Sequence, residues 1–278
     1  MRIVITGCKG QLGKALQSAL AQEQLLGLDL PEWDMTDPAC IRTVVGFQPD
    51  IVIHAAAMTN VDACERDPEA AFRVNVLGTQ YMALACGQSG AAMVHVSTND
   101  VFDGRLGRPF YEWDTPEPKS VYARSKAAAE FYVRTLLHHF YIVRTAWLYA
   151  RAGNSFVTKI LATADQVGAL QVVTDEVSSP TYAPDLAQAI ARLILTGYYG
   201  IYHFTNSGFC SRYDWACAVL KLACRDHVPV EPITTDQWPR PAPPPLYAPL
   251  VNFSGAALGI TLRPWQEGLQ EYFAGDSA

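Results

Sequence analysis

The feature that most constrains the fold of this chain is a short apolar segment that leads through a glycine-rich turn into a helix-length segment. The apolar segment covers residues 2–6, residues 7–13 read GCKGQLG, and a helix is expected over 11–22. Glycines allow a tight turn and close backbone approach, and a helix N-terminus attracts a pyrophosphate. The spacing is Gly-x-x-Gly-x-x-Gly rather than Gly-x-Gly-x-x-Gly, and a turn without a ligand is the alternative. The strand before the turn and the helix after it favour a nucleotide site.

Short apolar segments alternate with helix-length segments through the first half of the chain. Strands are expected over 25–29, 50–54, 92–97 and 140–144, and helices over 37–47, 68–88 and 121–138. Strands that alternate with helices form a parallel sheet covered on both faces. The pattern predicts an α/β fold with a doubly wound parallel sheet of the Rossmann type over residues 1–148.

The pattern loosens after residue 150. Helices are expected over 154–167, 184–196 and 212–224, and strands over 170–174 and 200–204. We expect residues 149–278 to form mainly a smaller C-terminal domain, with parts of about 170–205 returning to the Rossmann sheet. The proline-rich stretch 238–245 cannot be a helix or an inner strand. It is either a stiff surface connection or a loop that covers a binding site.

Composition limits the class of partner. The chain of 278 residues carries a formal net charge of −6 and has no basic run, which argues against a nucleic-acid surface. Its apolar stretches are shorter than the roughly 18 residues that a membrane span needs. The chain opens with a strand rather than a signal peptide, and its seven cysteines are an odd number in mostly apolar surroundings. We therefore expect a cytoplasmic protein with no membrane, nucleic-acid or metal partner.

Tyr122 and Lys126 are four residues apart in a segment that is expected to be helical, so their side chains share one helix face. A free tyrosine has a pKa of about 10 and is a poor proton shuttle at neutral pH. A fixed ammonium group beside it would lower that pKa and favour proton transfer. A half-buried tyrosine beside a solvated lysine produces the same spacing. The Ser97-Thr98 pair after an apolar segment, together with the glycine-rich turn, favours the catalytic interpretation.

Asp29 ends the second expected strand and lies nineteen residues after Gly10. An acid at this position binds the ribose diol of an adenosine and repels a 2′-phosphate, which favours NADH over NADPH. Lys9 in the turn acts in the opposite direction, so both cofactors stay candidates.

Together these segments resemble the extended short-chain dehydrogenase/reductase family and, within it, the dTDP-4-dehydrorhamnose reductase branch. The resemblance covers nearly the whole chain and fades in and after the proline-rich stretch. It is carried by residues 10–13 (GQLG), 49–57 (PDIVIHAAA) with Thr59, Val61 and Asp62, 97–98 (ST) with 101–104 (VFDG), 122–126 (YARSK), 144–149 (RTAWLY), 153–156 (GNSF), 179–181 (SPT) and 200–203 (GIYH).

The resemblance implies NAD(P)H-dependent reduction of the C4 keto group of a nucleotide-linked 4-keto-6-deoxy sugar, as in dTDP-rhamnose biosynthesis, and a substrate-binding C-terminal domain. Tyr122 would donate a proton to the carbonyl oxygen, and Thr98 would orient the carbonyl. Lys126 would hold the nicotinamide ribose and lower the pKa of Tyr122, so Tyr122 and Lys126 also belong to the cofactor site. The other cofactor contacts would be Gly7, Lys9, Gly10, Gln11, Leu12, Gly13, Asp29, Asp34, Met35, Ala57, Met58, Thr59 and Val96. The substrate contacts would be Thr98, Asn99, Trp147 and Arg240.

Two positions depart from the family pattern. The family carries Ser-Thr-Asp-Tyr-Val-Phe after this strand, and this chain has Asn99 and Asp100 in place of the Asp-Tyr pair. The exchange puts a carboxylate beside the reacting sugar, which leaves open an altered sugar, a different epimer or lowered activity. Some members bridge a dimer through Mg²⁺ held by glutamates, and Ala15 at the corresponding position cannot bind a metal. We expect a monomer or homodimer without this metal.

Two other functions stay open at this point. The same branch includes a regulatory subunit of methionine adenosyltransferase, and Asn99 with Asp100 is compatible with such a non-catalytic nucleotide-binding protein. The intact Thr98, Tyr122 and Lys126 favour the enzyme. A sugar-nucleotide epimerase or dehydratase is disfavoured, because nothing matches the longer C-terminal domains of those enzymes.

Overall fold

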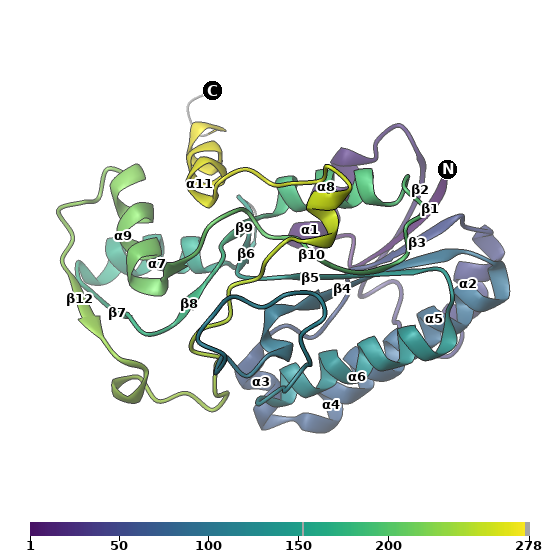
Figure 1. Ribbon diagram of the computed structural model, residues 1–278, viewed down its shortest axis with the longest axis horizontal. Helices are drawn as coiled ribbons and strands as arrows, with labels where there is room; N and C mark the ends of the chain where they lie inside the picture. The colour runs from purple at the N-terminus through teal and green to yellow at the C-terminus, as the bar shows by residue number, and fades with distance from the viewer. Residues whose placement is uncertain (152, 276–278) are drawn as a thin grey trace.

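A six-stranded parallel sheet forms the centre of the computed structural model, which describes residues 1–151 and 153–275 (Figure 1). The strand order is β10-β5-β4-β3-β1-β2, and all neighbours pair in parallel. The strands are β1 (Arg2–Thr6), β2 (Gln24–Leu28), β3 (Ile51–His54), β4 (Ala92–Thr98), β5 (Phe140–Thr145) and β10 (Gly200–His203). Since β2 and β3 lie on opposite sides of β1, the strand order reverses there, which is the usual ligand-binding point of such sheets. The predicted α/β Rossmann-type fold is confirmed.

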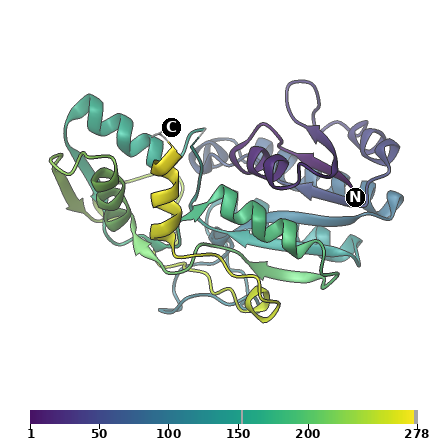
Figure 2. The same ribbon diagram turned by 90° about the horizontal axis from the view of Figure 1, so that it is seen from above.

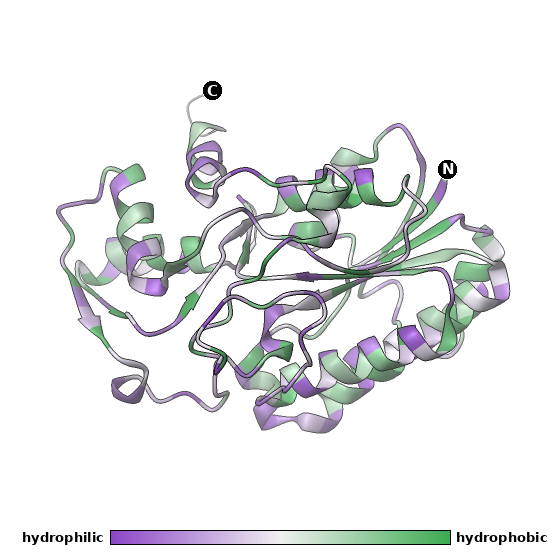
Figure 3. Ribbon diagram, in the orientation of Figure 1, coloured by the Kyte–Doolittle hydropathy of each residue, from purple (hydrophilic) through white to green (hydrophobic). Residues whose placement is uncertain are grey.

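Helices cover both faces of this sheet (Figures 1 and 2). Helices α1 (Gln11–Ala19) and α8 (Ala183–Leu193) pack together on one face, and α2 (Cys40–Phe47), α5 (Gly78–Ser89) and α6 (Val121–Leu136) cover the other. Ile3 and Ile5 of β1 pack in the core under α1 and α8, and Val4 packs in the core under α2, α5 and α6. This division arises because successive side chains of a strand point to opposite faces of the sheet. Figure 3 shows the largely hydrophobic strands between these layers.

The helix expected over 68–88 is interrupted. It consists of α4 (Pro68–Phe72), a π-helical turn η1 (Arg73–Leu77) and α5, and it follows the short helix α3 (Val61–Arg66). The π turn carries Asn75, whose buried amide accepts a hydrogen bond from Met58 N at 2.8 Å and donates to Met58 O at 3.1 Å and to Ser125 Oγ at 2.9 Å. Such turns disturb helical periodicity at one point for a local purpose. Here the turn ties the segment after β3 to α6.

A smaller region packs beside the carboxyl ends of the central strands, at the left of Figure 1. Its core gathers around the buried Trp215. The elements after β5, apart from α8 and β10, are β6 (Leu148–Tyr149), α7 (Phe156–Val167), β7 (Leu170–Val173), β8 (Val177–Ser178), β9 (Thr181–Tyr182), β11 (Cys210–Ser211), α9 (Arg212–Leu222), β12 (Val230–Ile233), the 3₁₀ turn η3 (Thr235–Gln237), α10 (Ser254–Ala257) and α11 (Trp265–Ala274).

The two strands that the sequence predicted within residues 170–205 have different partners. Strand β10 joins the central sheet beside β5, whereas β7 pairs with β12 in a separate two-stranded sheet. The division into domains at residue 148 stays a prediction. In the part of the chain that the structure describes, no helix combines the length and apolarity that a bilayer span requires.

Candidate active site

A cavity of about 1750 Å³ extends from the carboxyl ends of the central strands into the smaller region. Residues that directly follow β1, β3, β4 and β5 line one part of it, and residues of α7, β7 and the proline-rich stretch line the other. Trp238, Arg240 and residues 242–245 of the proline-rich stretch line this cavity. The structure therefore favours a loop that covers a binding site over a stiff surface connection. The cavity lies where the order of strands reverses, as expected for an open α/β sheet.

The glycine-rich turn after β1 forms one end of the cavity. Gly7 has a φ of +72°, and a Cβ on Gly13 would lie 2.1 Å from Gly7 O, so neither position accepts a side chain without rearrangement. Helix α1 has Gly10 as its N-cap, and no side chain caps it. Its first backbone N–H groups are left for an anionic ligand. The turn thus has the form that a pyrophosphate needs.

Asp29 lies directly after β2 at the same end. Its carboxylate accepts hydrogen bonds from Lys9 N and Leu30 N, both at 2.8 Å. The ammonium group of Lys9 forms an ion pair with Glu32 and donates to Leu30 O. Asp29 is therefore fixed by the turn, whereas the ion pair of Lys9 with Glu32 is exposed to solvent.

The structure places all but one of the predicted cofactor residues on the cavity wall. Those on the wall are Gly7, Lys9, Gly10, Gln11, Leu12, Gly13, Asp29, Asp34, Met35, Ala57, Thr59, Val96, Tyr122 and Lys126. Met58 is not among the wall residues and packs against a buried cluster around Cys64, so its predicted cofactor contact stays a prediction. The backbone N–H and C=O of Met58 are both hydrogen-bonded to the Asn75 amide.

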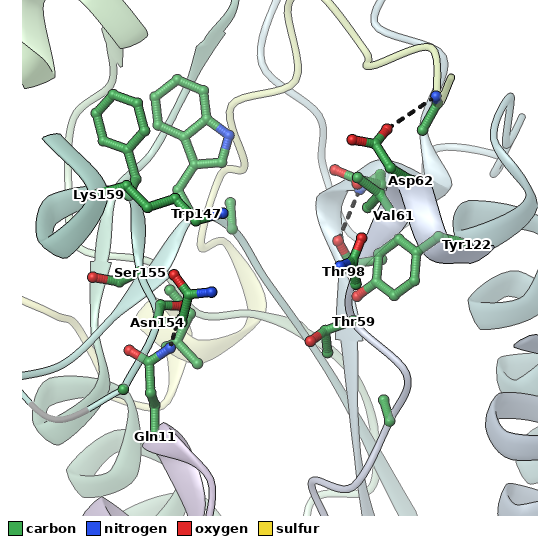
Figure 4. A pocket seen from close by; sticks show the side chains of 18 of the residues that line it. Gln11, Thr59, Val61, Asp62, Thr98, Tyr122, Trp147, Asn154, Ser155 and Lys159 are labelled. Carbon is green, nitrogen blue, oxygen red and sulfur yellow. Dashed lines mark hydrogen bonds between the residues drawn. The ribbon is translucent and has the colours of Figure 1, made fainter. Parts of the chain in front are cut away.

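Tyr122 and Thr98 lie together on one wall of the cavity, opposite Trp147, Asn154 and Gln11 (Figure 4). Thr98 is the last residue of β4, and Tyr122 lies in the first turn of α6. The N-terminus of α6 is fixed by its N-cap, the Ser120 hydroxyl, which accepts from Ala123 N at 3.1 Å.

Burial raises the pKa of Tyr122, the nearby charge of Asp100 adds to the rise, and a side-chain hydrogen bond with Thr98 opposes it. The lowered pKa that the sequence led us to expect is therefore not found. Desolvation of the phenolate is the largest cause of the shift. The phenol keeps its proton at neutral pH.

Lys126 is buried one helical turn after Tyr122. Its Nζ donates a hydrogen bond to Val96 O at 2.7 Å and lies 3.4 Å from His95 Nε2. Burial lowers the pKa of Lys126 to about 8, while the charge of Glu130 raises it. The amine is thus held against the end of β4 and is mostly charged at neutral pH.

A buried ion pair between β5 and α6 fixes the position of the helix that carries Tyr122 and Lys126. Arg144 of β5 contacts Glu130 of α6 through two hydrogen bonds of 2.9 and 2.7 Å, and Ser97 Oγ donates to the same carboxylate at 2.6 Å. The pair joins α6, which carries Tyr122, to the two strands beside it. Sequence reasoning identified Arg144 only as part of a motif, and Glu130 not at all.

Asn99 lines the cavity, but its amide is used inside the protein. Its Nδ2 donates to Ser178 Oγ at 3.2 Å and to Ala248 O at 3.3 Å, and its Oδ1 accepts from Thr98 Oγ1 at 3.4 Å. The residue is almost completely buried. Asn99 therefore connects Thr98 to the smaller region, and its predicted contact with substrate stays a prediction.

Trp147 projects from the segment between β5 and β6 with a φ of +44°, which is unusual for a bulky residue. Its ring is stacked on Trp215 at a centroid distance of 5.5 Å, and the guanidinium carbon of Arg212 lies 3.7 Å from its centroid. Close guanidinium–indole packing of this kind is a cation–π contact. Trp147 lines the cavity as part of this aromatic and cationic wall rather than as an isolated core residue.

Glu176 organises the charges at the substrate end. Its carboxylate is buried, forms an ion pair with Arg240, and lies 3.6 Å from Arg212 Nε. Burial lowers the pKa of Arg212 to about 10, and Glu176 opposes that shift. Arg240, which we predicted from its place in the proline-rich stretch, thus belongs to a charge cluster with Glu176, Arg212 and Asp100.

Sequence reasoning missed Glu176 and Arg212. Glu176 lies three residues before Ser179, where the 179–181 motif begins, and an acid between apolar segments was the available signal. Arg212 follows Ser211, which caps α9 together with Asp214, and a residue at a helix start has a simple structural explanation. Neither position is near Asp100 or Arg240 in the sequence.

Comparison with known proteins places this geometry in a family. Residues 1–277 match the family described as RmlD substrate binding domain. The chain is 40% identical to a dTDP-4-dehydrorhamnose reductase of Mycobacterium tuberculosis over 96% of this chain and 91% of that protein. It is 36% identical to the spore coat polysaccharide biosynthesis protein SpsK of Bacillus subtilis over 98% of this chain and 96% of that protein.

A solved structure agrees with the whole fold. The dTDP-4-dehydrorhamnose reductase of Bacillus anthracis in complex with NADP superposes with a TM-score of 0.95 at 35% identity, and the match covers 99% of both chains. The resemblance predicted from the motifs is therefore confirmed, and the chain belongs to the RmlD substrate binding domain family.

Proposed function

We propose that the protein reduces the C4 keto group of a dTDP-linked 4-keto-6-deoxy sugar with NAD(P)H. The observation that carries the proposal is the hydrogen-bonded pair of Tyr122 and Thr98 on the cavity wall, with Lys126 buried one turn further along α6. The pair faces Gln11 of the glycine-rich turn and Trp147 across the cavity (Figure 4). A carbonyl group held there would meet two hydroxyl donors at once.

The state of each group suits a reduction. Because burial raises the pKa of Tyr122, the phenol is protonated at neutral pH and can donate its proton to the developing alkoxide. The Thr98 hydroxyl can hydrogen-bond the same oxygen and fix its position. The charged Lys126 can then stabilise the phenolate that remains.

The cofactor end fits a dinucleotide. Gly7 and Gly13 let the turn pack tightly against Ala56 and against itself, and the first N–H groups of α1 are left for a pyrophosphate. Bound NAD(P)H would supply the hydride. The fixed Asp29 carboxylate favours a ribose with free hydroxyls over a 2′-phosphate. We therefore infer a preference for NADH, although the relative from Bacillus anthracis was crystallised with NADP.

At the substrate end, Arg240 is proposed to clamp the diphosphate of the sugar nucleotide. Its guanidinium group is held by Glu176, and its Nε has no hydrogen-bond partner in the described part of the chain. An Arg240→Ala variant should bind the nucleotide-sugar more weakly. Unchanged affinity would remove Arg240 from this role.

A direct turnover assay tests the proposal. The purified protein is offered NADH or NADPH with a panel of dTDP-4-keto-6-deoxy sugars, and the loss of reduced nicotinamide is followed by absorbance. Turnover of at least one sugar, with the higher kcat/KM for NADH, is the expected result. Tight cofactor binding without turnover of any keto sugar would refute the reductase and favour a non-catalytic nucleotide-binding protein.

A further inference from the structure

Asp100 is a carboxylate in the catalytic part of the cavity that has no internal partner among the described residues. It belongs to the 3₁₀ turn η2 (Asn99–Val101), which directly follows Thr98, and its side chain faces the cavity. Its backbone N–H donates to Thr98 Oγ1 at 3.1 Å. Within residues 1–151 and 153–275, its carboxylate forms neither a hydrogen bond nor an ion pair, although the residue is partly buried. A carboxylate that is partly withdrawn from water without a hydrogen-bond donor carries a free-energy cost.

The neighbouring cations do not satisfy Asp100. Arg212 and Arg240 both act on it electrostatically, but both are in contact with Glu176, which is itself buried. Arg212 is further held against the ring of Trp147. The cluster therefore pairs its two arginines with one acid and leaves the second acid open toward the cavity. Burial raises the pKa of Asp100 to about 6, as expected for a carboxylate that lacks donors.

Asp100 also lies close to the reacting groups. Its charge raises the pKa of Tyr122, and it is separated from Thr98 by one residue. A sugar whose C4 carbonyl is held by Tyr122 and Thr98 has only two ring neighbours of C4. In a 6-deoxy sugar, C5 carries a methyl group and the ring oxygen, neither of which donates a hydrogen bond. The substituent at C3 is the adjacent group that can donate one.

We propose that Asp100 is a specificity-determining residue that accepts a hydrogen bond from a donor on C3 of the sugar, either a hydroxyl or an ammonium group. This inference rests on the proposed reduction and names one feature of its substrate. The carboxylate selects for the donor because a sugar without it leaves the buried charge unsatisfied. An ammonium group would add an ion pair to the same contact.

The test compares substrates that differ only at C3. Three dTDP-4-keto-6-deoxy sugars, with a hydroxyl, an amino group or hydrogen at C3, are assayed with the wild type, Asp100→Ala and Asp100→Asn. The wild type should favour a C3 donor over hydrogen by about 10- to 100-fold in kcat/KM, as expected for a hydrogen bond to a charged group. In Asp100→Ala this ratio should fall to within about threefold of unity, with Asp100→Asn intermediate. Comparison of kcat/KM for the C3-hydroxyl and C3-amino sugars then shows which of the two groups is the preferred donor.

The control and the contradicting outcomes separate the two proposals. Asp103→Asn changes an acid three residues away that lies outside the cavity wall and pairs with Lys119, so the wild-type ratio should persist. Cofactor affinity, measured by fluorescence, shows that each variant is folded. An equal ratio in the wild type and Asp100→Ala would overturn the role of Asp100 alone. Failure of the wild type on every keto sugar would instead refute the proposed reduction.

Discussion

The two ends of the cavity are built in different ways. The cofactor end is made of backbone, with Gly7 at positive φ and Gly13 packed too closely for a side chain. The substrate end is made of side chains, and its charges come from four separate segments of the chain. Those charged residues are Asp100, Glu176, Arg212 and Arg240. Tyr122 and Thr98 lie on the wall opposite Gln11 of the cofactor end and Trp147 of the substrate end.

This difference determines how each end responds to change. A backbone-built site depends on the absence of side chains, so each critical glycine acts by steric exclusion. A charge cluster depends on mutual compensation, and the loss of one member leaves the others buried and unpaired. Substitutions at the cofactor end should therefore act mainly on ligand binding, whereas those at the substrate end should also affect stability.

The largest effect is expected at Tyr122, which faces both ends of the cavity. Tyr122→Phe removes the proton donor and should lower kcat by about 10³-fold, within the usual range for general acid catalysis. Cofactor affinity should stay within about threefold, because the ring and Lys126 remain. The control is Tyr132→Phe, which lies on the same helix but outside the cavity wall. Steady-state kinetics and fluorescence titration measure the two effects, and a wild-type kcat in Tyr122→Phe would refute the proton-donor role.

The next effect tests the side-chain-built end. Glu176→Gln removes the carboxylate that both arginines contact, and the free energy of unfolding should fall by about 3 kcal/mol. Urea denaturation measures this loss. Glu231→Gln is the matched control, since Glu231 is exposed and its carboxylate accepts a hydrogen bond from Gln171 at 2.7 Å. A change below about 0.5 kcal/mol, the usual range for surface substitutions, would show that the cluster does not stabilise the fold.

The third prediction tests the backbone-built end. A Cβ in Gly13→Ala would lie 2.1 Å from Gly7 O and 2.6 Å from Cys8 Cα, so the turn must move. The Kd for NADH should rise about 100-fold, which is about 2.7 kcal/mol. Gly46→Ala is the control, because a Cβ at this position on helix α2 would have no neighbouring atom within 4 Å among the described residues. Wild-type affinity in Gly13→Ala would mean that the turn does not hold the cofactor.

The sequence predicted the backbone-built end better than the other. Glycine spacing and strand–helix alternation are local signals, so the turn, Asp29 and the positions of Thr98 and Tyr122 could be placed from the sequence alone. The cluster around Glu176 brings together residues that are far apart in the chain, and no local pattern predicts such contacts. The pairing of β7 with β12 and the packing of Met58 against the Cys64 cluster are likewise decided by tertiary packing, and no local pattern predicts them. The pKa of Tyr122 depends on burial, which spacing alone does not report.

Acid should affect the two ends with opposite signs. His54 of β3 lies buried in the sheet below the cofactor end, and burial lowers its pKa to about 3. Between pH 6.5 and 3 the unfolded chain binds a proton at His54 that the folded protein does not, so stability falls as pH falls. The folded pKa of Asp100 is instead raised to about 6. Between pH 6 and 3.8 the folded protein binds the extra proton, so acid relieves the cost of the buried carboxylate.

Unfolding free energies at about pH 7 and about pH 5 separate these contributions. Over this interval, His54 should contribute a loss of about 2 kcal/mol and Asp100 a gain of about 1.4 kcal/mol. The His54→Gln variant should therefore lose less stability than the wild type on acidification, and Asp100→Asn should lose more. His227→Gln, at an exposed position, should follow the wild type. If Asp100→Asn and the wild type respond equally, the carboxylate already has a partner in the folded protein, and the contrast between the paired arginines and the open acid would fail with it.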